Sequence, residues 1–275
     1  MSNKIYVFGD LHGSYYPIRD FYNHYKDNKD FNFDGTDTII LLGDAGLNYY
    51  FNYRDDNFKN ALCDYPFNYF VIRGNHEERP SICTEKEPEK WKLEIFWENE
   101  VYVEKKYPKI KYALDIPACY RVPARDMNTR HYKILVIPGA YSVDKEYRLI
   151  NGWHWFSQEQ LSLKEMFDGL KTIEEHYGSF DIVLSHTCPI KYEPVDLFLS
   201  SIDQSKVDKS MELYLDYIDN VIDYDLWIWA HYHTYRYYDP EIWGDGGSRR
   251  KLMLFNNYCI DLDEWMNLNK EGEVL

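Results

Sequence analysis

Aspartate, histidine and asparagine residues recur along the sequence with spacings that suit metal binding. Asp10 and His12 are two residues apart, and so are His231 and His233. Residues two apart in an extended chain point to the same side, so both members of each pair can face a common centre. Three further candidates stand alone between these pairs: Asp44, Asn75 and His186.

This mixture of carboxylate, imidazole and amide ligands suits Mn²⁺, Fe or Zn²⁺ better than Ca²⁺. None of the seven candidate ligands is a cysteine, which argues against a structural zinc site. Seven ligands are too many for one tetrahedral ion but fit two ions that share a carboxylate. Asp44 lies alone in the tight turn Gly43-Asp-Ala-Gly46 and is the natural bridge. The sequence therefore predicts two divalent or trivalent ions of Mn, Fe or Zn.

The charge of such a site indicates its substrate. Two divalent ions with two carboxylates leave a net charge of +2, or +1 with a bridging hydroxide, inside a chain whose formal charge is -15. A positive well in an acidic protein attracts a compact phosphate more readily than a long polyanion, so we expect no tight non-specific binding of nucleic acid. Paired ions activate water and clamp the oxygens of an in-line displacement. The prediction is phosphate-ester hydrolysis by a metal-bridging hydroxide.

The octet Arg73-Gly-Asn-His-Glu-Glu-Arg-Pro80 adds candidate catalytic and substrate-binding groups. Adjacent residues that leave a strand tend to point in different directions. If Asn75 faces a metal, His76 is free to face the substrate and to protonate the leaving oxygen. Arg73 offers a planar fork for phosphate oxygens. We therefore predict Arg73, Asn75 and His76 as substrate contacts, and His76, Arg73 and Asp44 as catalytic residues.

The elements that must position these residues are short apolar runs, and most of the candidates directly follow one of them. We expect strands over residues 4–8, 38–42, 69–72, 132–137, 181–184 and 226–229. Continuous apolar runs suit strands buried on both faces, and function in open α/β sheets collects at the carboxyl ends of strands. We expect helices over residues 16–25, 54–64, 157–176 and 209–222, the third opening with the capping pattern Ser157-Gln-Glu-Gln160. The fold class is therefore α/β.

Residues 85–131 interrupt this alternation of strands and helices. A charged, helix-like piece over residues 85–100 precedes strand-like runs around Ala113 and Tyr120, which we interpret as hairpins of a second sheet. No internal repeat, low-complexity tract or Gly/Ser linker divides the chain. We expect one domain over residues 1–275.

Composition limits the class of protein. The chain is 45% hydrophobic and 18% aromatic, which is enough for a sizeable core. Its five cysteines form no Cys-x-x-Cys pair, which favours reduced thiols and a cytoplasmic location. The first strand begins too early for a signal peptide, and no apolar stretch approaches 18 residues, so we expect no membrane span.

Four motifs resemble the calcineurin-like metallophosphoesterase superfamily, in particular its bacterial and phage-type metallophosphatases. They are Asp10-Leu-His-Gly13, Gly43-Asp44, Gly74-Asn-His-Glu77 and His231-Tyr-His233, and the likeness runs from residue 5 to about residue 234. The resemblance implies a four-layer αββα sandwich of two mixed sheets flanked by helices, with a dinuclear metal site at the strand carboxyl ends. It implies that His76 is the general acid and that Arg73 contacts phosphate. The implied ligands of one ion are Asp10, His12, Asp44 and His233, and those of the other are Asp44, Asn75, His186 and His231.

Three readings of the function stay open. The sequence after Asp44 lacks the Asp-Arg-Gly of the protein-phosphatase branch, which weakens that assignment. The substrate is expected to be a small phosphorylated molecule or a short nucleotide, and a phosphoprotein remains open. One alternative is a phosphodiesterase acting on nucleotides or nucleic acid. The other is a non-catalytic binding scaffold, which retention of every candidate ligand disfavours. The segment Gly139-Ala-Tyr-Ser-Val-Asp-Lys145 followed by Arg148 resembles a segment of the family's bacterial and phage members. Its charged residues Asp144, Lys145 and Arg148 are consistent with a role in shaping the pocket and at least as consistent with surface charge.

Overall fold

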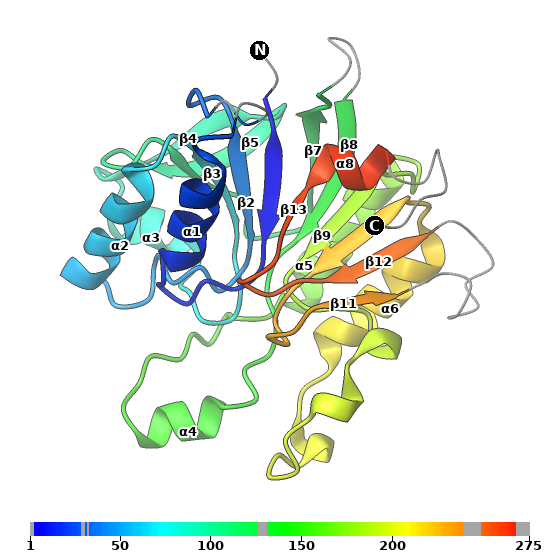
Figure 1. Ribbon diagram of the computed structural model, residues 1–275. Helices are drawn as coiled ribbons and strands as arrows, with labels where there is room; N and C mark the ends of the chain where they lie inside the picture. The colour runs from blue at the N-terminus through cyan, green and yellow to red at the C-terminus, as the bar shows by residue number, and fades with distance from the viewer. Residues whose placement is uncertain (1–2, 29–30, 32, 126–130, 239–248, 268–275) are drawn as a thin grey trace.

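The computed structural model describes residues 3–28, 31, 33–125, 131–238 and 249–267. Two β-sheets lie face to face, and helices cover their outer surfaces (Figure 1). The seven-stranded sheet has the order β13 (Cys259–Asp261), β1 (Ile5–Phe8), β2 (Thr38–Leu42), β3 (Asn68–Ile72), β6 (Ile110–Tyr112), β5 (Asn99–Glu104), β4 (Trp91–Phe96). The six-stranded sheet has the order β11 (Arg236–Tyr238), β12 (Arg250–Met253), β10 (Leu226–Trp229), β9 (Ile182–Ser185), β8 (His131–Ile137), β7 (Ala118–Pro123).

Both sheets are mixed. Strands β1, β2, β3 and β6 run parallel in the first sheet, and β8, β9, β10 and β12 run parallel in the second. Antiparallel strands complete the edges, with β13 and the pair β5–β4 in the first sheet and β11 and β7 in the second. The predicted α/β sandwich of two mixed sheets is confirmed.

The alternation of side chains along buried strands builds three apolar layers. In β1, Ile5 and Val7 point into the core between the two sheets, while Tyr6 and Phe8 point toward the helices of the first sheet. Helices α1 (Tyr16–Tyr25), α2 (Tyr53–Cys63) and α3 (Pro80–Lys86) supply the outer side of that layer. Helices α5 (Leu163–Glu175) and α6 (Ser210–Val221) do the same for the second sheet. Each parallel strand is therefore covered on both faces.

Most of the expected helices form close to the predicted positions. Helix α1 spans the predicted residues, and α2 and α6 differ by one residue at each end. The capping pattern expected at Ser157 is wrong, because α5 begins six residues later, where Ser162 and Glu165 form the capping box. The other helical pieces among the described residues are α4 (Lys145–Ile150), α8 (Leu262–Asn267), and the 3-10 turns Ile190–Tyr192, Val195–Leu197 and Gln204–Lys206. Within the described residues, no helix is both long and apolar enough to cross a membrane.

The interpretation of residues 85–131 is wrong for most of that segment. Helix α3 ends at Lys86, and residues 91–96 form a strand instead of the expected helix. Strands β4, β5 and β6 extend the first sheet, and within the segment β7 alone belongs to the second sheet, where it pairs with β8. Residues 126–130 lie outside the described part of the chain.

A hairpin without the usual turn residues explains this error. Phe96 pairs with Asn99, so Trp97 and Glu98 form a two-residue loop, and both have positive φ angles of 52° and 61°. Such loops normally carry glycine or asparagine. Here the Trp97 ring packs 4.8 Å from the Phe70 ring, which holds the turn by a long-range contact.

Candidate metal centre

All seven predicted metal ligands lie just beyond the carboxyl ends of strands. Asp10 and His12 follow β1, Asp44 follows β2 and Asn75 follows β3. His186 directly follows β9 in the second sheet, and the pair His231 and His233 follows β10. These strand ends face the lower side of the molecule in Figure 1, where the loops of the two sheets meet.

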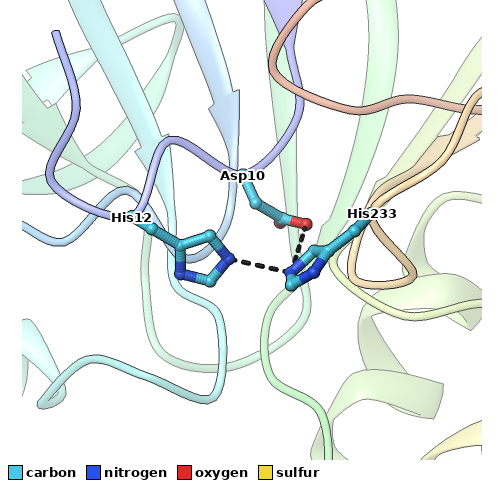
Figure 2. A group of neighbouring side chains, drawn as sticks. All are labelled: Asp10, His12 and His233. Carbon is cyan, nitrogen blue, oxygen red and sulfur yellow. Dashed lines mark hydrogen bonds and ion pairs between the residues drawn. The ribbon is translucent and has the colours of Figure 1, made fainter. Parts of the chain in front are cut away.

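The side chains gather into groups that are able to hold metal ions. Asp10, His12 and His233 form one group (Figure 2), in which Nε2 of His233 lies 2.8 Å from Nε2 of His12 and 3.6 Å from Oδ2 of Asp10. Asp44, His186 and His231 form a second group. These two groups divide the histidines as the resemblance implies.

Asp44 lies between the groups. Its Oδ2 atom is 3.5 Å from Nε2 of His186 and 3.5 Å from Nδ1 of His76, and the residue is buried. Asp44 also belongs to a third metal-capable group, with His12 and His76. One carboxylate therefore reaches both sides of the cluster, which is the position that a bridging ligand requires.

The backbone is strained at four of these ligands. His12, Asp44, His231 and His233 have φ angles of 47°, 44°, 69° and 52°, a left-handed conformation that residues with a side chain rarely adopt. Each such residue costs about 1–3 kcal/mol and persists where the surrounding structure overdetermines it. Here the amide of His12 donates to the carbonyl of Asp44 at 2.8 Å, which ties the two loops together. The fold therefore holds these side chains inward at the expense of backbone strain.

Two motif glycines provide the space for the cluster. A Cβ atom at Gly43 would overlap the imidazole of His186, and one at Gly74 would overlap the carboxylate of Asp44. Gly43 also has a φ of 91°, which favours glycine. The glycines thus let ligands from different strands approach one another closely.

Hydrogen bonds orient His186 and Asn75 toward the cluster. Nδ1 of His186 donates to the carbonyl of Leu42 at 2.7 Å, so its Nε2 faces the cluster, 3.0 Å from Oδ1 of Asn75. Nδ2 of Asn75 donates to Oγ of Ser142 at 2.9 Å, and Ser142 in turn donates to Glu159 at 2.5 Å. Hydrogen bonds from a ligand side chain to residues outside the cluster fix the direction in which its ligand atom points. Sequence reasoning missed the roles of Ser142 and Glu159.

Glu77 supports the turn that carries Asp44. Its Oε1 accepts hydrogen bonds from the amides of Gly46 at 2.5 Å and Leu47 at 3.1 Å. Burial, together with the nearby Asp44 carboxylate, raises the pKa of Glu77 to about 7. The residue lies in the Gly74–Glu77 motif, so its position was visible in the sequence although its partners were not.

The electrostatics of the cluster favour a cation. Burial raises the pKa of Asp10 to about 8 and lowers that of His12 to about 4. A buried carboxylate and a neutral imidazole are both stabilised by a metal ion, which compensates the charge of the carboxylate and binds the lone pair of the imidazole. The chemistry of this donor set therefore fits metal ions.

His76 lies at the edge of the cluster with 20% of its side chain exposed. Its backbone amide donates to Oδ1 of Asp44 at 2.8 Å, and its Nε2 lies 3.7 Å from Oδ1 of Asp144. Burial and the nearby Arg148 cation oppose protonation, but the carboxylates of Asp44 and Asp144 outweigh them and raise the pKa of His76 above its usual value. His76 is thus placed beside the metal ligands and open to a substrate.

Arg73, the predicted phosphate contact, is buried and faces other parts of the chain. Arg73 is 3% exposed, its Nη1 donates to the carbonyls of Glu159 at 2.8 Å and Gly74 at 3.0 Å, and its Nε lies 3.2 Å from Asp115. The guanidinium therefore ties the end of β3 to distant segments and presents no free edge to solvent. The sequence offered no sign of its partner Asp115.

Comparison with known proteins also indicates a metal-dependent phosphoesterase. The family model described as calcineurin-like phosphoesterase matches residues 3–235. The crystal structure of TT1561 from Thermus thermophilus is similar in fold, with a TM-score of 0.51 and 14% identity over 95% of each chain. Phosphopantetheinyl hydrolase (PptH) from Mycobacterium tuberculosis gives a TM-score of 0.44 and 12% identity, over 99% of this chain and 93% of that one. No curated protein matches the sequence.

Proposed function

Because the chain belongs to the calcineurin-like phosphoesterase family, a family of metal-dependent phosphate-ester hydrolases, we propose that it cleaves small phosphate esters with His76 as the general acid. One observation carries the proposal. The carboxylates and imidazoles at the strand ends gather around the buried Asp10 and Asp44, and His76 lies at the edge of this group, with Nδ1 3.5 Å from the central Asp44. Ligands and acid thus share one accessible site.

The ligand assignment follows the two groups of side chains. In our proposal Asp10, His12 and His233 hold one ion, and Asn75, His186 and His231 hold the other, with Asp44 shared between them. When bound, two such ions lower the pKa of a water molecule and neutralise charge on a phosphate group. The four histidines favour Mn, Fe or Zn over Ca²⁺, which takes oxygen ligands.

His76 supplies the proton in this scheme. Its ring lies beside Asp44 and Asp144, whose charges favour the protonated imidazolium, and its partial exposure allows a substrate oxygen to approach. A positioned acid protonates the leaving oxygen as the ester bond breaks, and such a group typically contributes about 10²–10⁴-fold to the rate.

The substrate proposal rests on charge. A chain with a formal charge of -15 repels long polyanions, so phosphomonoesters or short nucleotides are favoured over DNA or RNA. A phosphoprotein with an exposed phosphate stays open as a substrate. The proposed location is the cytoplasm, on the basis of five cysteines without a paired motif.

Turnover of a substrate panel tests this function. The Mn²⁺-loaded protein is assayed with phosphomonoesters, phosphodiesters, dinucleotides and phosphopeptides at fixed salt, and chelator-treated protein is the control. We expect metal-dependent cleavage, with the highest kcat/KM for small monoesters or short nucleotides. Preference for diesters would replace the monoesterase by a phosphodiesterase, and absence of any turnover would indicate a binding scaffold.

A further inference from the structure

A segment that leaves the second sheet places two charged residues beside His76. Residues 141–156 follow β8 and include α4, which lies below the strand ends, away from both sheets (Figure 1). Asp144 directly precedes this helix, and Arg148 stands four residues later, in its last turn. The sequence left them undecided between pocket residues and surface charge, and the structure places both at the metal centre.

Arg148 is held on one side and faces the site on the other. Its Nε donates to Oδ2 of Asp144 at 2.8 Å, and its Nη1 donates to Oη of Tyr49 at 3.1 Å. Its Nη2 lies 2.9 Å from Nδ1 and 3.0 Å from Nε2 of His76. The side chain is 9% exposed. Two partners thus orient the guanidinium so that the Nη2 edge points at the proposed acid.

This position matches what phosphate binding requires. A phosphate whose leaving oxygen lies at His76 has its other oxygens next to that residue, within reach of a guanidinium that touches the same ring. Arginine donates in a planar fork that suits phosphate oxygens. Among the described arginines, Arg148 alone makes hydrogen-bond contact with His76, whereas Arg73 is buried against Asp115. The phosphate contact expected of Arg73 is therefore available from Arg148.

We propose that Arg148 binds the phosphate group of the substrate and that Asp144 is a positioning residue for its guanidinium. The proposal deepens the phosphoesterase function above and rests on it. It assigns a substrate contact to α4, which belongs to neither sheet and carries no predicted metal ligand.

Binding of inorganic phosphate to the Mn²⁺-loaded protein tests the role of Arg148. Titration calorimetry compares wild type, Arg148→Gln and Arg148→Lys. Hydrogen bonds to charged groups contribute about 1.5–3 kcal/mol, so Arg148→Gln should weaken the Kd for phosphate by about 10–100-fold. Arg148→Lys keeps the charge but loses the planar fork, so its Kd for phosphate should lie between those of wild type and Arg148→Gln. A Kd within about twofold of wild type for both variants, at equal metal content, would overturn the proposal.

Lys164→Gln is the control. It removes the same charge from helix α5, where Lys164 is 86% exposed and its Nζ pairs with Asp168 at 3.0 Å. This variant should leave the phosphate Kd unchanged. An equal loss in Lys164→Gln and Arg148→Gln would show a general charge effect and would overturn a specific contact. Arg148→Lys keeps the test decisive if Arg148→Gln does not fold.

A double-mutant comparison tests Asp144 as a positioning residue. Asp144→Asn should weaken phosphate binding less than Arg148→Gln does, and the double variant should bind no more weakly than Arg148→Gln alone, because Asp144 acts through the arginine. Additive losses would contradict this role. Turnover measured on the same wild-type preparation separates the two proposals. Lack of turnover would overturn the phosphoesterase function, while the phosphate titrations still decide the role of Arg148.

Discussion

Asn75 and Ser142 are joined by a hydrogen bond of 2.9 Å that connects the end of β3 in the first sheet to the loop after β8 in the second. Because Ser142 also donates to Glu159, and Glu159 accepts from the indole of Trp155 at 2.9 Å, the amide of Asn75 is held from outside the cluster. Its oxygen is thereby turned toward His186. One metal ligand is thus oriented by residues of the other sheet.

Ser142→Ala should weaken metal binding without removing a ligand. Loss of the hydroxyl frees the Asn75 amide to rotate, and loss of such outer partners typically lowers metal affinity by about 10–100-fold. Titration of the metal-free protein with Mn²⁺ measures the effect. Ser205→Ala, which alters an exposed 3-10 turn, is the control. Unchanged affinity for both ions would contradict the orienting role.

Asp44→Asn should remove at least one ion and abolish most of the turnover. The carboxylate lies within reach of both groups of ligands, and an amide carries neither the charge nor the second oxygen donor. Metal analysis of purified wild type and variant measures the stoichiometry. Two ions per chain with normal activity would show that Asp44 is not the bridge.

His76→Asn should lower kcat by about 10²–10⁴-fold, the range typical of losing a general acid, while the metal content stays the same. The loss should shrink for nitrophenyl phosphate, since a good leaving group needs little protonation. Rate constants for a series of leaving groups provide the measurement. The same loss for every leaving group would remove His76 from the role of acid.

Arg73→Met should destabilise the protein and leave KM close to wild type. Asp115 is 5% exposed, and a buried charge left without its partner costs about 3–5 kcal/mol. Chemical denaturation and KM for nitrophenyl phosphate are measured on the same sample. The exposed pair Arg121 and Glu98 is the control, since Arg121→Met should cost less than about 1 kcal/mol. A large rise in KM with unchanged stability would return Arg73 to the substrate site.

Glu212→Gln should change how stability depends on pH. Burial raises the pKa of Glu212 to about 7 from an ordinary value of 4.5. Between these values the folded state holds a proton that the unfolded state has lost, so this residue's stabilisation is present below pH 4.5 and is lost as pH rises through 7. Glutamine carries no charge, and its side-chain oxygen can still accept the hydrogen bond that the Thr187 hydroxyl donates to Oε1 of Glu212 at 2.9 Å.

The free energy of unfolding at pH 5 and pH 8 measures this effect. We expect the variant to gain on the order of 1–3 kcal/mol over wild type at pH 8 and little at low pH. Replacement of the exposed Glu174 by Gln is the control. Parallel pH profiles for wild type and Glu212→Gln would contradict the raised pKa.

Sequence alone located the strands of the parallel core and the positions of the candidate ligands. Apolar runs such as residues 38–42 end abruptly at a glycine and an aspartate, and a run buried on both faces has no other stable place than the centre of a covered sheet. Since parallel strands place their carboxyl ends together, Asp44 and Asn75 were expected at the same edge of the sheet, and the parallel pairing of β2 with β3 places them there.

Contacts between residues distant in sequence determined features of the fold that the local sequence pattern does not indicate. Residues 91–96 alternate apolar and polar side chains, but their strand depends on the Trp97–Glu98 turn and on pairing with β5. No glycine marks that turn, so the sequence carried no local signal for it. The strained φ angles of His12 and Asp44 likewise follow from the packing of whole loops.

The two arginines show the same division most clearly. In sequence, Arg73 stands beside the Asn75-His76 pair, and Arg148 stands in a charged stretch where pocket residue and surface charge were both open. In the structure, Arg73 is buried against Asp115 and against a carbonyl 86 residues later, while Arg148 reaches His76 from 72 residues away. The sequence determined which side chains leave the strand ends. Burial and ion pairing, which depend on partners far along the chain, decided which arginine faces the site.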